Sequence, residues 1–228
     1  MRGAVTTSFG ELLLIVASLS HLISVLYPIC QLSVPDLSNL KRVATSTFGE
    51  KMELNSRPIA PDPYKALPEL PTFTLTSADM TAGGQMPTAQ IAAGENLSPQ
   101  LSWSGFPKET KSFLLTCFDP DAPTPSGFWH WLITDIPAEM TSLPTGAGSS
   151  DLELEGAAFH LRNDGGDWSY MGAAPPKGDR PHRYIFAVHA LDTETLELDE
   201  DASAAAANFH ALFHSLARAT LEVTYQNK

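Results

Sequence analysis

From residue 73 onward the chain consists of short segments that have the alternation and composition of β-strands. Clusters of proline, glycine and asparagine separate them, which is the pattern typical of an all-β sandwich. The predicted strands cover residues 73–77, 100–104, 112–119, 129–134, 157–161 and 183–192, with a last one at 221–225. Because no sequence repeat or long heptad pattern accompanies them, we expect a mainly β domain rather than a solenoid or a helical bundle.

Alternation within two of these segments also predicts which side chains share a face. In SFLLTCFD, the odd-numbered residues from Phe113 to Asp119 lie on one side of the strand. In RYIFAVHA, the even-numbered residues from Tyr184 to Val188 do the same, and His182 precedes them on that side. The apolar members of both sets are therefore candidates for the core.

One α-helix is predicted near the C-terminus, over residues 202–220. Asp201 or Ser203 is suited to cap its first turn, because both side chains accept hydrogen bonds from free backbone N–H groups. The apolar residues that recur at helical spacing are Phe209, Leu212, Phe213 and Leu216.

The charge distribution divides the chain in two. Its 228 residues include 14 basic and 26 acidic ones, for a net charge of -12. The first 60 residues are nearly neutral, so the acidic surplus belongs to the rest. We predict an N-terminal extension at 1–60 and one domain at 61–228. The acidic domain would repel a phosphate backbone, so no nucleic acid is expected as a partner.

The extension contains a hydrophobic segment with no charged residue between Glu11 and Asp36. The segment is long enough to span a bilayer, but serines and a histidine interrupt it. Only Arg2 precedes it as a basic residue, and no Ala-x-Ala cleavage site follows. Translation from Met52, which implies a cytoplasmic protein, is the first interpretation. A membrane anchor and an export signal are the alternatives.

Several classes of chemistry lack their sequence signals. Cys30 and Cys117 are the two cysteines and lie on opposite sides of the division, so a disulfide framework is not supported. No glycine-rich phosphate loop or nucleophile elbow occurs, and the pair His210 and His214 lacks the glutamate of a zinc protease helix. We therefore expect no enzyme, no cofactor and no metal. A metal-dependent hydrolase is the less favoured alternative, because aspartate and histidine suit transition ions.

Two segments, 117–137 and 168–192, hold most of the unusual polar residues. Asp119 and Asp121 flank Pro120, which stiffens the turn that presents both carboxylates. His130 lies in an apolar strand between two tryptophans, and its ring needs a buried partner, for which a carboxylate is the natural candidate. His182 lies where a loop meets a strand, so we expect it to contribute to binding more than to stability.

Three stretches resemble the signatures of the phosphatidylethanolamine-binding protein family, also called Raf kinase inhibitor-like proteins, in its bacterial and archaeal branch. The first is Asp119-Pro120-Asp121-Ala122-Pro123, followed by Gly127 and His130-Trp131. The second is Tyr170, Gly172, Pro175-Pro176, Gly178 and His182-Arg183-Tyr184. The third is Asn96-Leu97-Ser98-Pro99 with Leu101, Trp103, Gly105 and Pro107. The similarity covers about residues 71–225.

The resemblance implies a Greek-key β-sandwich with a C-terminal helix and a small pocket between the first two signatures. The residues that it places in the pocket are Asp119, Asp121, His130, His182, Tyr184 and Pro175. It implies a non-catalytic protein that binds a phosphate-type anion or a phosphatidylethanolamine headgroup. It also raises two further expectations, modulation of a protein kinase and inhibition of a protease by protein contact. The sequence leaves a monomer and a homodimer open.

Two carboxylates alone would repel a phosphate. They can, however, orient the two histidines and raise their pKa values, so that an imidazolium meets the anion. We therefore expect Asp119 and Asp121 to pair with His130 and His182, and we expect both histidines to have raised pKa values. A zwitterionic headgroup would also bring an ammonium group to the carboxylates.

Overall fold

The computed structural model describes residues 53–228, which form one structural unit. The hydrophobic segment of the predicted extension and Cys30 lie outside the described residues. Within residues 53–228, no helix is both long enough and apolar enough to cross a membrane.

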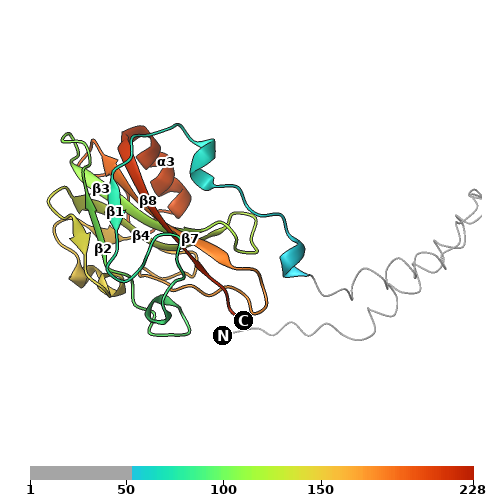
Figure 1. The fold of residues 1–228 in the computed structure, drawn as a ribbon. Helices are drawn as coiled ribbons and strands as arrows, with labels where there is room; N and C mark the ends of the chain where they lie inside the picture. The colour runs from blue at the N-terminus through green and yellow to red at the C-terminus, as the bar shows by residue number, and fades with distance from the viewer. Residues whose placement is uncertain (1–52) are drawn as a thin grey trace, which may run out of the picture. The chain divides into compact units, whose positions relative to one another are not determined.

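Eight strands in the described part of the chain form two antiparallel sheets (Figure 1). The small sheet has the order β1-β2-β5, formed by Thr74–Thr76, Leu101–Ser104 and Ser142–Leu143. The large sheet has the order β6-β4-β3-β7-β8, formed by Phe159–His160, Phe128–Pro137, Ser112–Asp119, His182–Leu191 and Ser215–Tyr225. In the large sheet, β3, β4 and β6 follow one another, and β7 then pairs with β3 on the side away from β4. This is a Greek-key order. The predicted mainly β sandwich is confirmed.

Short helical turns lie in the connections. They are the 3-10 helices η1 Leu54–Ser56, η2 Pro63–Ala66, η3 Thr88–Gln90, η4 Ala147–Ser149 and η5 Asp151–Glu153. The one α-helix of the described residues is α3, Ala204–His214.

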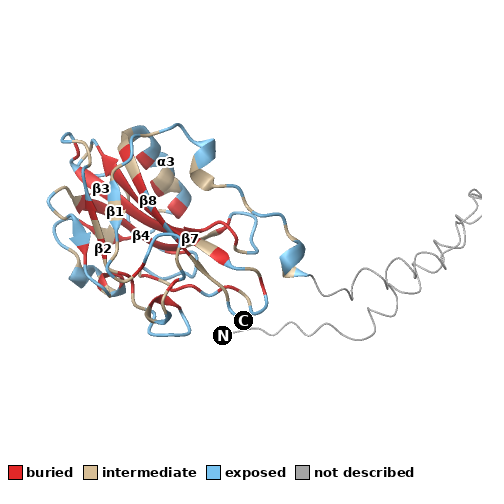
Figure 2. Cartoon of the chain, in the orientation of Figure 1, coloured by how far each residue is buried: buried red, intermediate tan, exposed pale blue. Residues whose placement is uncertain are grey.

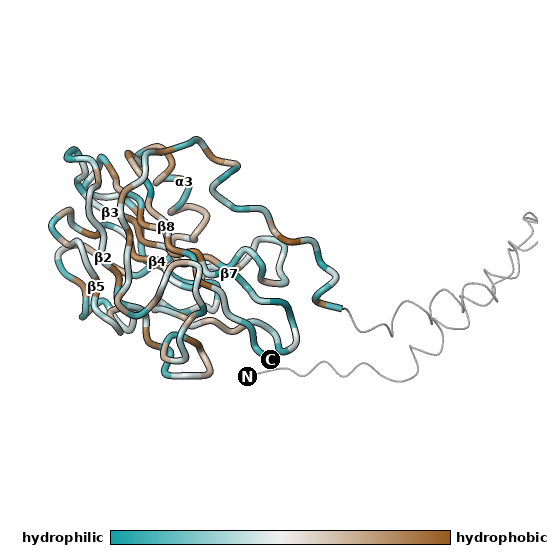
Figure 3. Tube along the Cα trace, in the orientation of Figure 1, coloured by the Kyte–Doolittle hydropathy of each residue, from teal (hydrophilic) through white to brown (hydrophobic). Residues whose placement is uncertain are grey.

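The main core lies between the two sheets. The predicted inward faces are confirmed, because Phe113 and Cys117 of β3 and Phe186 of β7 are fully buried in this cluster. Trp103 of β2 meets Phe113 edge to face with 5.4 Å between ring centroids, so the contact joins the small sheet to the large one. Figure 2 shows the buried residues concentrated along the strands of the large sheet, where Figure 3 also shows hydrophobic residues.

Helix α3 covers the other face of the large sheet. Its buried residues Ala204, Ala207 and Ala211 pack with a second cluster that includes Leu114 and Leu132. Strand β3 is therefore covered on both faces, and every one of its residues is buried. Ser203 caps the helix by accepting a hydrogen bond from the N–H of Ala206 at 3.2 Å.

The predicted helix was too long, and the larger apolar residues noted at helical spacing are not the ones that pack on the sheet. Alanine, rather than the larger apolar residues, packs on the sheet, because small side chains let the helix lie close to it. Phe209 and Phe213 are 61% and 67% exposed. Leu216 does not belong to the helix, because β8 begins at Ser215 and pairs with β7 as far as Tyr225. Pairing along a whole strand outweighs the helix propensity of this alanine-rich segment.

Candidate functional site

The candidate site lies where the end of β3 meets the start of β7. These strands pair antiparallel, so Asp119 at the end of β3 comes close to His182 at the start of β7. The Nδ1 atom of His182 lies 2.7 Å from Oδ2 of Asp119, and both side chains are buried. The other carboxylate oxygen, Oδ1, accepts a hydrogen bond from the N–H of Asp121 at 2.8 Å, which holds the turn after the strand. Asp119 thus orients His182 as expected.

A second carboxylate, from Asp179, binds the opposite nitrogen of the same ring. Oδ2 of Asp179 lies 3.1 Å from Nε2 of His182, and the Asp179 side chain has no exposed surface. Burial acts to lower the pKa of His182, but the hydrogen bonds and charges of Asp119 and Asp179 outweigh it and raise that pKa. Because each nitrogen faces a carboxylate, we infer that both nitrogens donate and that His182 is an imidazolium.

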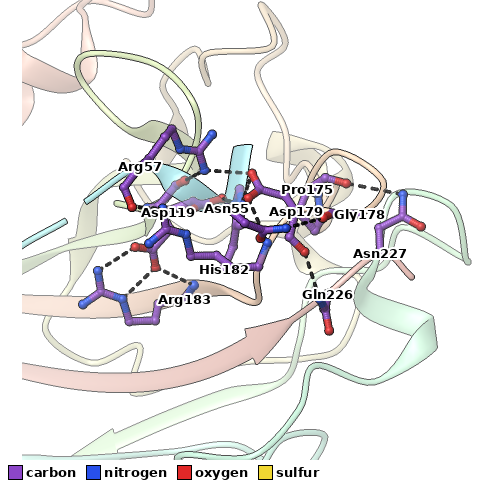
Figure 4. A network of polar contacts seen from close by, with 12 residues as sticks. Asn55, Arg57, Asp119, Pro175, Gly178, Asp179, His182, Arg183, Gln226 and Asn227 are labelled. Atoms are coloured by element: carbon purple, nitrogen blue, oxygen red, sulfur yellow. Dashed lines mark hydrogen bonds and ion pairs between the residues drawn. The ribbon is translucent and has the colours of Figure 1, made fainter. Parts of the chain in front are cut away.

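Arg57 completes this ionic array from the segment that precedes the sandwich (Figure 4). Its Nη2 donates to Oδ2 of Asp179 at 2.7 Å and to the backbone carbonyl of Asp121 at 3.0 Å. Burial acts to raise the pKa of Asp179, but the donors around it, which include His182 and Arg57, lower that pKa. Sequence reasoning missed Arg57 and Asp179. A carboxylate three residues before a signature histidine was the available signal for Asp179, whereas nothing local pointed to Arg57.

Asp121 has a different partner from the one expected. It faces Arg183 in a bidentate ion pair, with Nε to Oδ2 at 2.7 Å and Nη2 to Oδ1 at 2.8 Å. Burial acts to raise the pKa of Asp121, but hydrogen bonds and charge from Arg183 lower it. Neither histidine hydrogen-bonds to Asp121. The aspartate and arginine of the two signatures therefore neutralise each other and tie the turn to β7.

His130 also differs from the sequence expectation. It lies in β4, and its Nδ1 is 2.9 Å from the carbonyl oxygen of Met171, so its partner is a backbone carbonyl and not a carboxylate. Nδ1 must donate, because a carbonyl can only accept. Burial lowers the pKa of His130, and the smaller effects of the Met171 carbonyl and of Asp119 do not reverse this shift. The expectation of a raised pKa is therefore wrong for His130, which is neutral at pH 7.

Tyr184 packs against the ring of His130. Its ring meets the imidazole edge to face, with 5.1 Å between centroids, and its side chain is almost fully buried. Burial, together with the charge of Asp119, raises the pKa of the phenol, which stays protonated. Tyr184 therefore supports the position of His130.

A cavity of about 220 Å³ opens between these groups. Its charged or titratable lining residues are Asp119, His130 and His182. The rest of the lining is mainly apolar, with Ala122, Pro123, Phe128, Met171, Ala174, Pro175 and Pro176, together with Thr124. Four of the six predicted residues thus line the cavity, whereas Asp121 and Tyr184 lie outside the lining set.

Gly127 shapes the loop that closes one wall. Its φ of 69° is in the left-handed region, and a Cβ there would clash with the Phe118 ring and lie 2.8 Å from the carbonyl oxygen of Asp119. Only glycine lets the loop return so close to the end of β3. Among residues 53–228, no group of three or more His, Cys, Asp or Glu side chains is arranged to hold a metal ion.

Comparisons with known proteins agree with this architecture. Residues 76–226 match the family model described as phosphatidylethanolamine-binding protein. The chain is 45% identical to the UPF0098 protein YbhB of Escherichia coli K12 over 156 residues, which are 66% of this chain and 98% of YbhB. It is 43% identical to the UPF0098 protein YbcL of the same organism, over 68% of this chain and 88% of YbcL.

Solved structures agree as well. The crystal structure of E. coli YbcL, described as a new member of the mammalian PEBP family, has a TM-score of 0.66 and 42% identity, with coverage of 68% of this chain and 99% of that one. A homolog from Chlamydia trachomatis, CT736, has a TM-score of 0.61 and 29% identity, with coverage of 69% and 99%. On its sequence and its fold, the chain belongs to the phosphatidylethanolamine-binding protein family.

Proposed function

We propose that this protein is a non-catalytic ligand-binding protein whose cavity takes a small oxyanion of the phosphate type, either free or as the headgroup of a phospholipid. The observation that carries the proposal is the hydrogen bonding of the two ring nitrogens of His130. Its Nδ1 is held by the Met171 carbonyl, with the backbone of Gly172 nearby, and among residues 53–228 no side chain is hydrogen-bonded to its Nε2. When an oxyanion enters the cavity, Nε2 would take up a proton from solvent. The protonated Nε2 would then donate a hydrogen bond to the anion.

The charge balance around the cavity supports an anion despite the nearby carboxylates. The negative charges of Asp119 and Asp179 are matched by His182 and Arg57, through contacts of 2.7 to 3.1 Å. The bidentate pair of Asp121 with Arg183 is neutral by the same count. With these charges cancelled, one proton on His130 gives the cavity a net positive group.

The family supports the choice of ligand, because its description names phosphatidylethanolamine. A phosphoethanolamine headgroup carries an ammonium group close to its phosphate. Asp119 lines the same cavity as His130, so the ammonium group of such a zwitterion would lie near a carboxylate, although that carboxylate is already paired with His182. The apolar wall that includes Phe128 and Pro175 suits the methylene groups between them.

Action on a protein kinase or a protease stays a prediction of its own. The same holds for the homodimer, for the cytoplasmic location and for its alternatives. Each of them concerns a protein surface or the N-terminal extension. The ligand proposal depends on neither.

Calorimetric titration with sulfate, inorganic phosphate and phosphoethanolamine tests the proposal. Sulfate does not titrate in this range, so its affinity reports the protein alone. We expect its affinity to rise as pH falls from 7.5 through 6.5 by up to about tenfold per pH unit, because binding takes up one proton. Cosedimentation with phosphatidylethanolamine vesicles, against phosphatidylcholine vesicles, separates a lipid headgroup from a free anion as the source.

The matched variants are His130→Asn and His130→Gln. Asparagine can keep the donor to Met171 and loses the group at Nε2, so it should fold and lose the pH dependence. Glutamine keeps a polar group near the position of Nε2 but cannot become cationic. Absence of binding for all three ligands between pH 5.5 and 7.5 would overturn the proposed function, and a pH-independent affinity would overturn the role of His130.

A further inference from the structure

Residues 55–60, which we call the N-terminal strap, are hydrogen-bonded to the loops of the site (Figure 4). Asn55 donates to the carbonyl of Gly178 at 2.9 Å, and Arg183 donates to the carbonyl of Ala60 at 2.7 Å. The strap precedes residues 76–226, which match the family model. Its contacts are therefore a feature of this chain outside the matched domain, and they reach the ligand site itself.

The central contact of the strap is the carboxylate that it shares with His182. Oδ2 of Asp179 accepts from Nη2 of Arg57 at 2.7 Å and from Nε2 of His182 at 3.1 Å. The second oxygen, Oδ1, accepts from the N–H of Arg180 at 2.8 Å. Two cations thus compete for one oxygen, and the arginine makes the shorter contact.

This sharing changes what it costs to move the Nε2 proton of His182 toward a ligand. Asp179 is fully buried, and a buried carboxylate that loses its only cation is strongly destabilised. With Arg57 in place, Asp179 keeps a cation when His182 turns its Nε2–H to an anion in the cavity that it lines. Without Arg57, Asp179 would hold His182 as its sole cationic partner.

We propose that Arg57 is a positioning residue for the ligand site: by neutralising Asp179, it frees the Nε2–H of His182 to be shared with an anionic ligand. The inference rests on the proposed function and adds a second donor to the cavity that His130 lines. Through Arg57 alone, the N-terminal strap acts on the ligand site without touching the ligand.

The charges that face His182 come from three elements. Asp119 at the end of β3 binds Nδ1, and Asp179 in the preceding loop binds Nε2. Asp121 in the turn after β3 acts at longer range and is neutralised by Arg183. Without the Arg57 charge, the negative charge of Asp179 would act on His182 alone. The pKa of His182 should then rise further, while that of His130 should stay unchanged.

The test uses the full chain with Arg57→Gln, sulfate as the probe, and NMR titration of the histidine rings. We expect the pKa of His182 to rise and the sulfate affinity to fall about tenfold, which corresponds to the loss of one net hydrogen bond. Arg57→Lys keeps the charge and should hold the pKa of His182 near its wild-type value. Asn55→Ala is the matched control, because it loosens the strap without contact to Asp179 and should bind sulfate like the wild type.

A double-mutant cycle with Asp179→Asn isolates the shared carboxylate. In that background, Arg57→Gln should have no further effect on sulfate affinity. The inference is overturned if Arg57→Gln leaves both the His182 pKa and the affinity unchanged, if it strengthens binding, or if Asn55→Ala causes an equal loss. Failure of the wild type to bind any oxyanion is a different result, which removes the proposed function and this inference together.

Discussion

The two histidines of the cavity are both buried and both face the same small space, yet they carry different charge. His182 has a carboxylate at each nitrogen and an elevated pKa. His130 has a backbone carbonyl at one nitrogen and a lowered pKa, because burial is the largest effect on it. The charge of a buried imidazole is thus decided by what each of its nitrogens contacts, and an aspartate elsewhere in the same site is not enough.

Because of this difference, we expect His182 and His130 to act differently when a ligand binds. His182 is paired with Asp119 and Asp179 before any ligand arrives, so it organises the ends of β3 and β7, and it can share its Nε2–H with a ligand only because Arg57 also pairs with Asp179. The His130 ring is neutral and its Nε2 can be protonated, so the ring can respond to a ligand by taking up a proton. A site with two charged histidines would have attracted anions at every pH below about 7, whereas this one couples anion binding to a proton.

The largest expected effect is on stability. His182→Ala leaves two buried carboxylates without their shared cation, and we expect it to lower the free energy of unfolding by about 3–5 kcal/mol. His130→Ala removes one hydrogen bond to a carbonyl and some packing, with an expected loss of about 1–3 kcal/mol. Urea unfolding at pH 7 measures both. A loss for His130→Ala that equals or exceeds that for His182→Ala would contradict the comparison.

The next effect is the dependence of stability on pH. The pKa of His130 is lower in the folded chain than the unfolded value of about 6.5, so its contribution falls as pH drops below 6.5. The pKa of His182 is raised, so its contribution is present below 6.5 and is lost as pH rises through the folded pKa. Each slope is at most about 1.4 kcal/mol per pH unit.

Two variants separate the loss of stability below pH 6.5 from the loss above it, in unfolding experiments at several pH values. His130→Asn should flatten the loss of stability below pH 6.5. Asp119→Asn should flatten the loss above it, because His182 then keeps one carboxylate instead of two. The assignment fails if the two variants flatten the opposite limbs.

The smallest effect concerns the two aspartates of the first signature. Asp119→Asn should lower the pKa of His182 clearly, because it removes a direct 2.7 Å contact. Asp121→Asn should shift that pKa much less, because Asp121 contacts Arg183 and acts on His182 only at longer range. NMR titration of the two variants compares the shifts. Equal shifts would return Asp121 to the histidine partner role that the sequence suggested.

The fold was predictable from the sequence where local pattern and burial agree. Strand β3 was predicted at the bounds that the structure has, because its apolar residues are bracketed by turn signals. Strand β8 was missed in part, although Ala217, Ala219, Leu221 and Val223 are buried in strict alternation with polar residues. That period of two competed with a helix-forming composition, and composition was given too much weight.

The site was predictable to the extent that it is contained in the signatures. Asp119, His130 and His182 line the cavity as expected. Their electrostatics were not, because the pKa of each ring depends on contacts with Met171 and Asp179 that only the folded chain brings together. Arg57 lies 122 positions from Asp179, and no spacing rule connects residues so far apart. His182 was expected to contribute to binding more than to stability, but it is buried and contacts two carboxylates, so we now expect it to contribute to both.

The most direct test of the account is the protonation of the two rings in the ligand-free protein at pH 7. Long-range proton–nitrogen NMR of the histidine rings distinguishes an imidazolium from each neutral tautomer. We expect His182 to be protonated at both nitrogens, and His130 to be neutral with its proton on Nδ1 and none on Nε2. A neutral His182, or a His130 that carries its proton on Nε2 or is charged at pH 7, would contradict it.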